Sequence, residues 1–278
     1  MAAAAASAVG RGERPGAGGA AGVGRSGAGG LTVTHRGGGY RYLPAGDAYS
    51  GGVAAEPGFE FVALTFAEPK PVAEGFARLD RELAARGLTA SALVGVHLRS
   101  QAPVDLGAFD DFNVRYHALL AERGVLEDAV NPVARTNVVP VHAPPAEPVI
   151  HTAFVVRAAA GAGGTDFVVA GCGEIIGGLA PENIVARGDL SPAGLTRKAS
   201  AVLAEIGDRV RRLGVDASVA ATVNVYTSHE VTGLPDLLVD GLPVVARSGF
   251  VRWLTSPPVV EVEFEMDCHR VSAWQAIP

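Results

Sequence analysis

Cysteine, tryptophan and methionine are scarce in this chain, with two residues of each among 278. Cys172 and Cys268 lack the paired spacing of a zinc or redox motif, and they favour a reduced, cytoplasmic setting. The net charge of −6 comes without a basic run, which argues against nucleic-acid binding. No apolar stretch approaches the roughly 18 residues of a membrane span. What remains is a globular protein, as 48% hydrophobic and 19% charged residues indicate.

The chain does contain an internal repeat. Arg-Gly-Leu-Thr-Ala-Ser at 86–91 and Leu-Gly-Val-Asp-Ala-Ser at 213–218 each follow an amphipathic run and precede an alternating apolar run. Farther along, Ala-Arg-Thr at 134–136 corresponds to Ala-Arg-Ser at 246–248. The order helix, glycine, strand, arginine therefore occurs twice, which predicts two domains of like fold.

Composition divides the chain into three parts. Residues 1–30 are mainly Ala and Gly with scattered Arg, so we expect a disordered arm rather than a secretion signal. A second Ala/Gly-rich run, at 158–164, has the composition of a linker. The sequence therefore predicts an N-terminal domain over 31–157 and a C-terminal domain over 165–278.

The first copy is predicted to have the order β-β-α-β-α-β-β. Pro71 is well suited to begin a helix and Gly87 to end it, and a second helix is expected over 109–123. The Gly-rich segment 50–52 predicts a turn between the two opening strands. The expected strands are 40–43, 59–66, 93–99, 138–141 and 149–156. Such a sheet buries one face under its two helices.

The second copy repeats this order with a weaker second helix. Ser191 and Pro192 predict the start of a long helix that Gly214 ends. The other expected elements are strands over 167–170, 219–226 and 259–265 and a short helix over 235–239. Strict alternation in the last strand places Glu261, Glu263 and Glu265 on one face. That face is either solvated or meets a cation such as Arg247.

These motifs resemble the RidA/YjgF family of reactive intermediate deaminases. The likeness covers about residues 40–270, and the motifs that carry it are Phe109, Asn113 and Tyr116, residues 131–136, residues 246–248 and residues 260–263. It implies an α+β fold of two tandem RidA/YjgF-like, chorismate-mutase-like domains. Because that family forms trimers with clefts between neighbours, it also implies a homotrimer.

The resemblance implies a site as well. The family's carboxylate-binding arginine falls on Arg135 and Arg247, and its water-positioning glutamate falls on Glu261 alone. The other matched cleft positions, implied to bind substrate, are Asn113, Tyr49, Thr65 and Cys172. The second copy has no residue that corresponds to Asn113, and the first copy has none that corresponds to Glu261. Each copy therefore looks like half a site. The structural alternatives are surface ion pairs for the arginines, a solvated strand face for Glu261 and a small buried hydrophobe for Cys172.

The implied chemistry is hydrolytic deamination of a small carboxylate-bearing enamine or imine. Arg247 would hold the carboxylate through two parallel hydrogen bonds, and Glu261 would hold water against the imine carbon. This reaction requires no metal and no organic cofactor, and no His pair has ligand spacing.

Two other functions stay open. Chorismatases also resemble this chain, since they have an N-terminal copy without the glutamate and a C-terminal copy with an alternating glutamate strand. That reading gives a lyase or hydrolase acting on a cyclic enol-ether carboxylate. The third possibility is a non-catalytic small-molecule-binding protein, because fold does not determine function.

Overall fold

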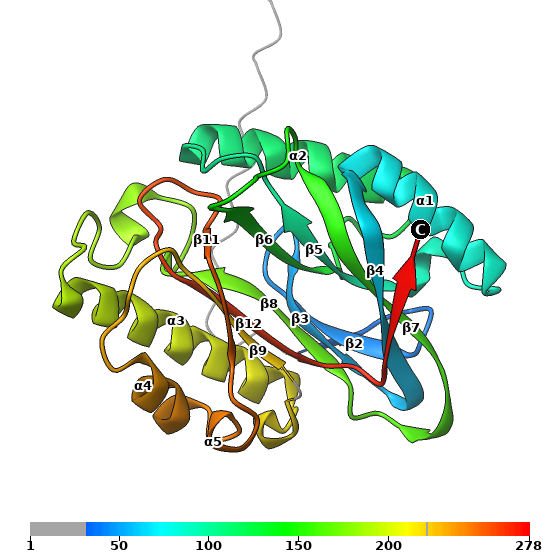
Figure 1. The fold of residues 1–278 in the computed structure, drawn as a ribbon. Helices are drawn as coiled ribbons and strands as arrows, with labels where there is room; N and C mark the ends of the chain where they lie inside the picture. Colours follow the sequence, from blue (N-terminus) through cyan, green and yellow to red (C-terminus); the bar gives the residue numbers. More distant parts are fainter. Residues whose placement is uncertain (1–31, 221) are drawn as a thin grey trace, which may run out of the picture.

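One mixed sheet dominates the computed structural model, which describes residues 32–220 and 222–278. All 13 strands of this described part belong to that sheet, in the order β10-β9-β12-β8-β3-β6-β5-β7-β4-β13, with β1, β2 and β11 paired beside this path (Figure 1). The arm expected over 1–30 lies outside the described residues. No helix in the described part combines the length and apolar character needed to cross a membrane.

Short connections join most of the elements. The strands are β1 (Val33–Thr34), β2 (Tyr40–Pro44), β3 (Ser50–Ala55), β4 (Pro57–Pro71), β5 (Leu93–Arg99), β6 (Ala134–Pro140), β7 (Val149–Gly163), β8 (Phe167–Gly173), β9 (Thr222–Tyr226), β10 (Val251–Trp253), β11 (Thr255–Ser256), β12 (Glu265–Arg270) and β13 (Ala273–Ile277). The α-helices are α1 (Val72–Ala85), α2 (Leu106–Glu122), α3 (Pro192–Leu213), α4 (Leu234–Gly241) and α5 (Val245–Ser248), and single 3-10 turns cover Ala90–Ala92, Pro181–Asn183 and Ala217–Val219.

Local signals explain the helix ends. The Ser191 side chain accepts the N–H of Gly194 at the start of α3, and Gly214 ends that helix in the left-handed conformation. Asp105 caps α2 in the same way by accepting the N–H of Ala108. The predictions of a helix from Pro192 to Leu213 and of a strand over 93–99 are confirmed.

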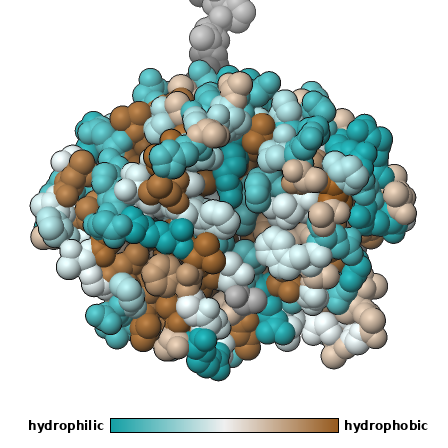
Figure 2. All heavy atoms as spheres, viewed as in Figure 1, coloured by the Kyte–Doolittle hydropathy of each residue, from teal (hydrophilic) through white to brown (hydrophobic). Residues whose placement is uncertain are grey.

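The helices cover the sheet in two groups. Helices α1 and α2 pack on the strands of the first half, where Phe76, Tyr116 and Phe154 share one core cluster. Helix α3 packs on β8 and β12, with β2 and β3 beside them, and its Val202 and Ile206 belong to a second cluster. In Figure 1 these groups lie at the top and at the lower left of the sheet. Figure 2 shows patches of hydrophobic residues over the lower-left region, and hydrophilic residues cover much of the rest of this face.

The expected fold of two tandem β-β-α-β-α-β-β domains is wrong. The segment Ser50–Ala55, expected to begin as a Gly-rich turn, forms β3 and pairs with β8, so strands of both halves join in one sheet. Strand β13 leaves the second half and pairs in parallel with β4 of the first. These pairings are contacts between residues far apart in the sequence, and local patterns do not encode them. The boundaries 31–157 and 165–278 stay a prediction, and residues 158–163 continue β7.

Candidate functional site

A hollow opens to solvent where β6, β8 and the start of β12 meet α2. Its polar lining comes from Tyr49, Arg135, Asn137 and Glu265. Apolar side chains and two glycines form the remaining wall: Phe109, Gly171, Gly173, Ile175, Leu179, Pro258, Val259 and Val262. A concave, mostly apolar site with a few convergent polar groups is typical of a small-molecule site.

Arg135 is the cation of this hollow. It projects from β6, and 4% of the residue is exposed. Its Nη2 donates to the Asn113 side-chain oxygen at 2.8 Å, while its Nη1 is buried without a hydrogen-bond partner among the described residues. Burial lowers the pKa of the guanidinium, but an arginine stays charged in proteins. A buried cation with a free donor is suited to receive an anion.

Aromatic rings surround the guanidinium. Its central carbon lies 4.9 Å from the ring centre of Tyr49 and 5.0 Å from that of Tyr116, with the rings of Phe109 and Phe112 slightly farther away. The negative faces of these rings stabilise the charge without neutralising it. The cage therefore holds Arg135 in place and leaves its charge available to a ligand.

Glu265 is the carboxyl group of the hollow. It begins β12 beside Gly171, where an added Cβ would lie 2.2 Å from the Glu265 Oε1, so the glycine makes room for this side chain. Burial raises the pKa of Glu265 to about 8, and repulsion from Asp267 adds to this, while attraction to Arg135 acts in the opposite direction. Glu265 is therefore mostly protonated at pH 7, and a carboxyl group poised near neutral pH can both donate and accept a proton.

A buried ion pair fixes the backbone that leads into Glu265. Lys198 of α3 lies 3.0 Å from Glu174, and both side chains are fully buried. Glu174 also accepts the N–H groups of Glu263 and Phe264 at 2.6 and 2.9 Å. Burial raises the pKa of Glu174, whereas these hydrogen bonds and Lys198 favour its ionised form. The pair thus anchors the residues just before Glu265.

Three of the residues expected from the sequence come together here. Arg135 and Tyr49 line the hollow, and Asn113 holds Arg135 from α2. Cys172 does not line it, because it alternates with Gly171 and Gly173 on β8 and packs in the cluster beneath α3, where burial raises the pKa of its thiol to about 12. Thr65 lies on β4, where its hydroxyl is 3.2 Å from that of Thr152.

Glu261 and Arg247 lie elsewhere. Residues 259–262 form a turn rather than the expected strand, and Glu261 has a left-handed backbone with a φ of 70°. Its exposed carboxylate pairs with Arg187 at 2.6 Å, and the hydrogen bond from Arg187 lowers the pKa of Glu261. Arg247 lies on the short helix α5, exposed, and donates to the carbonyl of Ser218. The structure therefore does not bring Arg247 and Glu261 together.

In the sequence, Glu265 is the last of three alternating glutamates, which local pattern makes equivalent. A signal for its distinct position was present, because the polar residues Glu265, Asp267 and His269 alternate with Met266 and Cys268. The alternation that starts at Glu265 follows strand β12, whereas the row of glutamates starts at Glu261, in the turn before that strand. Asn137 and the two glycines of β8 carried no local signal.

Comparison with known proteins identifies the family. The model of the 2-aminomuconate deaminase CnbZ family matches residues 32–275. A 2-amino-5-chloromuconate deaminase from Comamonas testosteroni is 39% identical over 235 residues, which are 83% of this chain and 92% of that protein. The expected membership of the RidA/YjgF family is therefore wrong.

The similar solved structures are more distant. A chorismatase is 12% identical with a TM-score of 0.46, and the match covers 87% of this chain and 79% of that one. A cyanuric acid hydrolase is 10% identical with a TM-score of 0.38, over 80% of this chain and 70% of the other. The matched family model spans nearly the whole described chain, and the relative is similar over most of both lengths. The chain therefore belongs to the 2-aminomuconate deaminase CnbZ family and is a deaminase.

Proposed function

We propose that this enzyme hydrolyses the enamine of a 2-aminomuconate-type dicarboxylate, releasing ammonia and leaving a 2-oxo acid. The observation that carries the proposal is the placement of a cation with a free donor, Arg135, and a mostly protonated carboxyl group, Glu265, in one hollow. The named relative acts on 2-amino-5-chloromuconate, which joins an enamine to carboxylates.

Arg135 binds the carboxylate next to the amine-bearing carbon. Its free Nη1 donates to that carboxylate, and Asn113 keeps the guanidinium oriented through Nη2. A charge-assisted hydrogen bond of this kind contributes about 1.5–3 kcal/mol. The apolar wall, with Phe109 and Val262, covers the conjugated carbon chain.

Glu265 moves the protons. As the neutral acid it protonates the carbon β to the amine, so the enamine becomes an iminium ion. The resulting carboxylate accepts a proton from the attacking water, whose oxygen bonds to the iminium carbon. The proton of the new hydroxyl passes to the amine, the carbon–nitrogen bond breaks, and ammonia leaves as the carbonyl forms. Glu265 ends in its starting form, and the net reaction consumes one water.

The test is ammonia release from 2-aminomuconate by the parent enzyme and matched variants. Glu265→Gln keeps the size of the side chain but cannot exchange protons, so turnover should fall by about 10² to 10⁴. Glu261→Gln and Glu263→Gln are the controls, since neither residue lines this hollow. Loss of turnover in Glu261→Gln with a fully active Glu265→Gln would move the chemistry to the position first expected from the sequence.

The substrate class needs a separate measurement. Parallel incubations of the parent enzyme with 2-aminomuconate and with chorismate, assayed for ammonia and pyruvate, separate a deaminase of this substrate class from a chorismatase-like enzyme. Ligand binding without either product would support a binding protein and contradict the proposal.

A further inference from the structure

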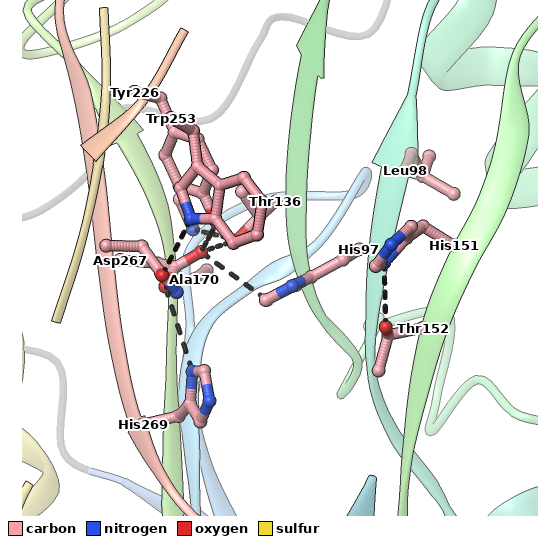
Figure 3. A network of polar contacts seen from close by, with 12 residues as sticks. His97, Leu98, Thr136, His151, Thr152, Ala170, Tyr226, Trp253, Asp267 and His269 are labelled. Carbon is pink, nitrogen blue, oxygen red and sulfur yellow. Dashed lines mark hydrogen bonds and ion pairs between the residues drawn. The ribbon is translucent and has the colours of Figure 1, made fainter. Parts of the chain in front are cut away.

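A second polar cluster lies outside the hollow. His97 of β5 meets Asp267 and His269 of β12, and Figure 3 shows these side chains directed toward one another between the strands. The His97 Nε2 lies 3.4 Å from the Asp267 Oδ2, and the His269 Nδ1 lies 3.8 Å from the Asp267 Oδ1. One donor atom from each residue lies within 4.8 Å of the others, and all three residues are buried.

The imidazole nitrogens form no hydrogen bond within the described part of the chain, although His97 Nε2 and His269 Nδ1 face the Asp267 carboxylate at ion-pair distance. The His97 Nε2 and both ring nitrogens of His269 are buried without a hydrogen-bond partner among the described residues. Leaving such groups unsatisfied in a protein interior is unfavourable, so each one requires an explanation. The orphaned nitrogens belong to the two rings that flank the Asp267 carboxylate.

Three hydrogen-bond donors stabilise the carboxylate of Asp267. Its Oδ2 accepts from the hydroxyls of Thr136 and Tyr226, both at 2.8 Å, and its Oδ1 accepts from the Asn224 amide at 2.7 Å. No Lys or Arg in the described part forms an ion pair with it. Among the described residues its ion-pair contacts are with the imidazoles of His97 and His269. A buried carboxylate is normally paired with a cation or coordinates a metal.

We propose that His97, Asp267 and His269 bind a divalent first-row transition ion, with Zn²⁺ as the first choice. Two imidazoles and one carboxylate are a donor set for these ions, whereas Mg²⁺ and Ca²⁺ prefer oxygen ligands. Thr136, Asn224 and Tyr226 are the outer groups that orient the carboxylate ligand, and the rings of Phe154 and Trp274 shield the site. The cluster needs small side-chain adjustments to bring all three donors to bonding distance.

The site would connect distant parts of the sheet. Strands β5 and β12 are not neighbours, because β6, β3 and β8 lie between them in the strand order. A metal bound to His97 and to the two β12 residues would therefore cross-link the curled sheet. This role goes beyond the proposed deaminase chemistry, and its test does not depend on activity.

The experiment uses the full chain, freed of metal with a chelator and then titrated with Zn²⁺ or Co²⁺. We expect one ion per chain by elemental analysis, visible Co²⁺ bands characteristic of nitrogen and oxygen ligation, and a rise of several degrees in Tm on metal addition. His269→Gln and His97→Gln should lose the ion, the bands and the rise in Tm.

His229→Gln is the matched control. It removes a histidine that lies 2.8 Å from a carboxylate, Glu263, outside the cluster, and it should keep all three signals. Circular dichroism confirms that each variant is folded. A parent chain that takes up no stoichiometric metal, or cluster variants that bind it as the parent does, would overturn the proposal whether or not the enzyme deaminates.

Discussion

Glu265→Gln should stabilise the protein at neutral pH while it lowers turnover by about 10² to 10⁴. Burial of Glu265 holds its pKa near 8 in the folded chain, against an ordinary value of 4.5. Between these values the unfolded chain loses the proton and the folded chain keeps it, so folding becomes less favourable as pH rises. Each pH unit in this window lowers the free energy of unfolding by about 1.4 kcal/mol. The accumulated cost at pH 7 is about 3 kcal/mol. Glutamine is neutral at every pH and avoids this cost.

The assay is urea unfolding at pH 5, 6, 7 and 8, which gives the free energy of unfolding for each variant. The difference between Glu265→Gln and the parent should be small at pH 5 and should grow in favour of the variant up to about pH 8. Glu261→Gln is the control, since its exposed carboxylate pairs with Arg187 outside the hollow and its pKa is lowered, so it should show no such growth. A Glu265→Gln variant less stable than the parent at pH 8, or a difference independent of pH, would refute the assignment of a neutral buried carboxyl group.

Four further predictions concern two arginines, the pH profile and the oligomeric state. Arg135→Lys should lower kcat/KM by about ten- to a hundredfold, because lysine cannot bind Asn113 and a carboxylate in the same fixed geometry; unchanged kinetics would remove Arg135 from the site. The kcat/KM of the parent should fall as pH rises through about 8, as Glu265 loses the proton it donates, and a profile flat to pH 9 would contradict its role as the acid. Arg247→Lys should leave turnover close to that of the parent, since the exposed Arg247 donates to the Ser218 carbonyl and does not line the hollow; a large loss in steady-state kinetics would restore the role first expected for it. The homotrimer expected from the sequence rested on the RidA/YjgF resemblance and stays an untested prediction; a monomer in light scattering at micromolar concentration would contradict it.

Local sequence signals determined the elements whose ends depend on near neighbours. The cap at Ser191, the stop at Gly214 and the apolar run over 93–99 each act within a few residues, and the structure has α3 and β5 at those places. Asn113 and Arg135 were expected only from the resemblance to the RidA/YjgF family, and the structure joins them by a hydrogen bond between side chains of α2 and β6.

Tertiary structure decided how the halves join and which glutamate enters the hollow. The glycines of β3 suggest a turn to any local rule, and their strand forms because β2 and β8 supply its hydrogen-bond partners. Glu261, Glu263 and Glu265 are equivalent in an alternating pattern, which has no information on where the strand begins. The buried pair of Glu174 and Lys198 holds residues 263 and 264 through backbone hydrogen bonds, and Gly171 leaves space for Glu265. The contacts of Glu174 with residues 263 and 264 join positions about 90 apart, so the pKa of Glu265 and its place beside Arg135 exist only after the chain has folded.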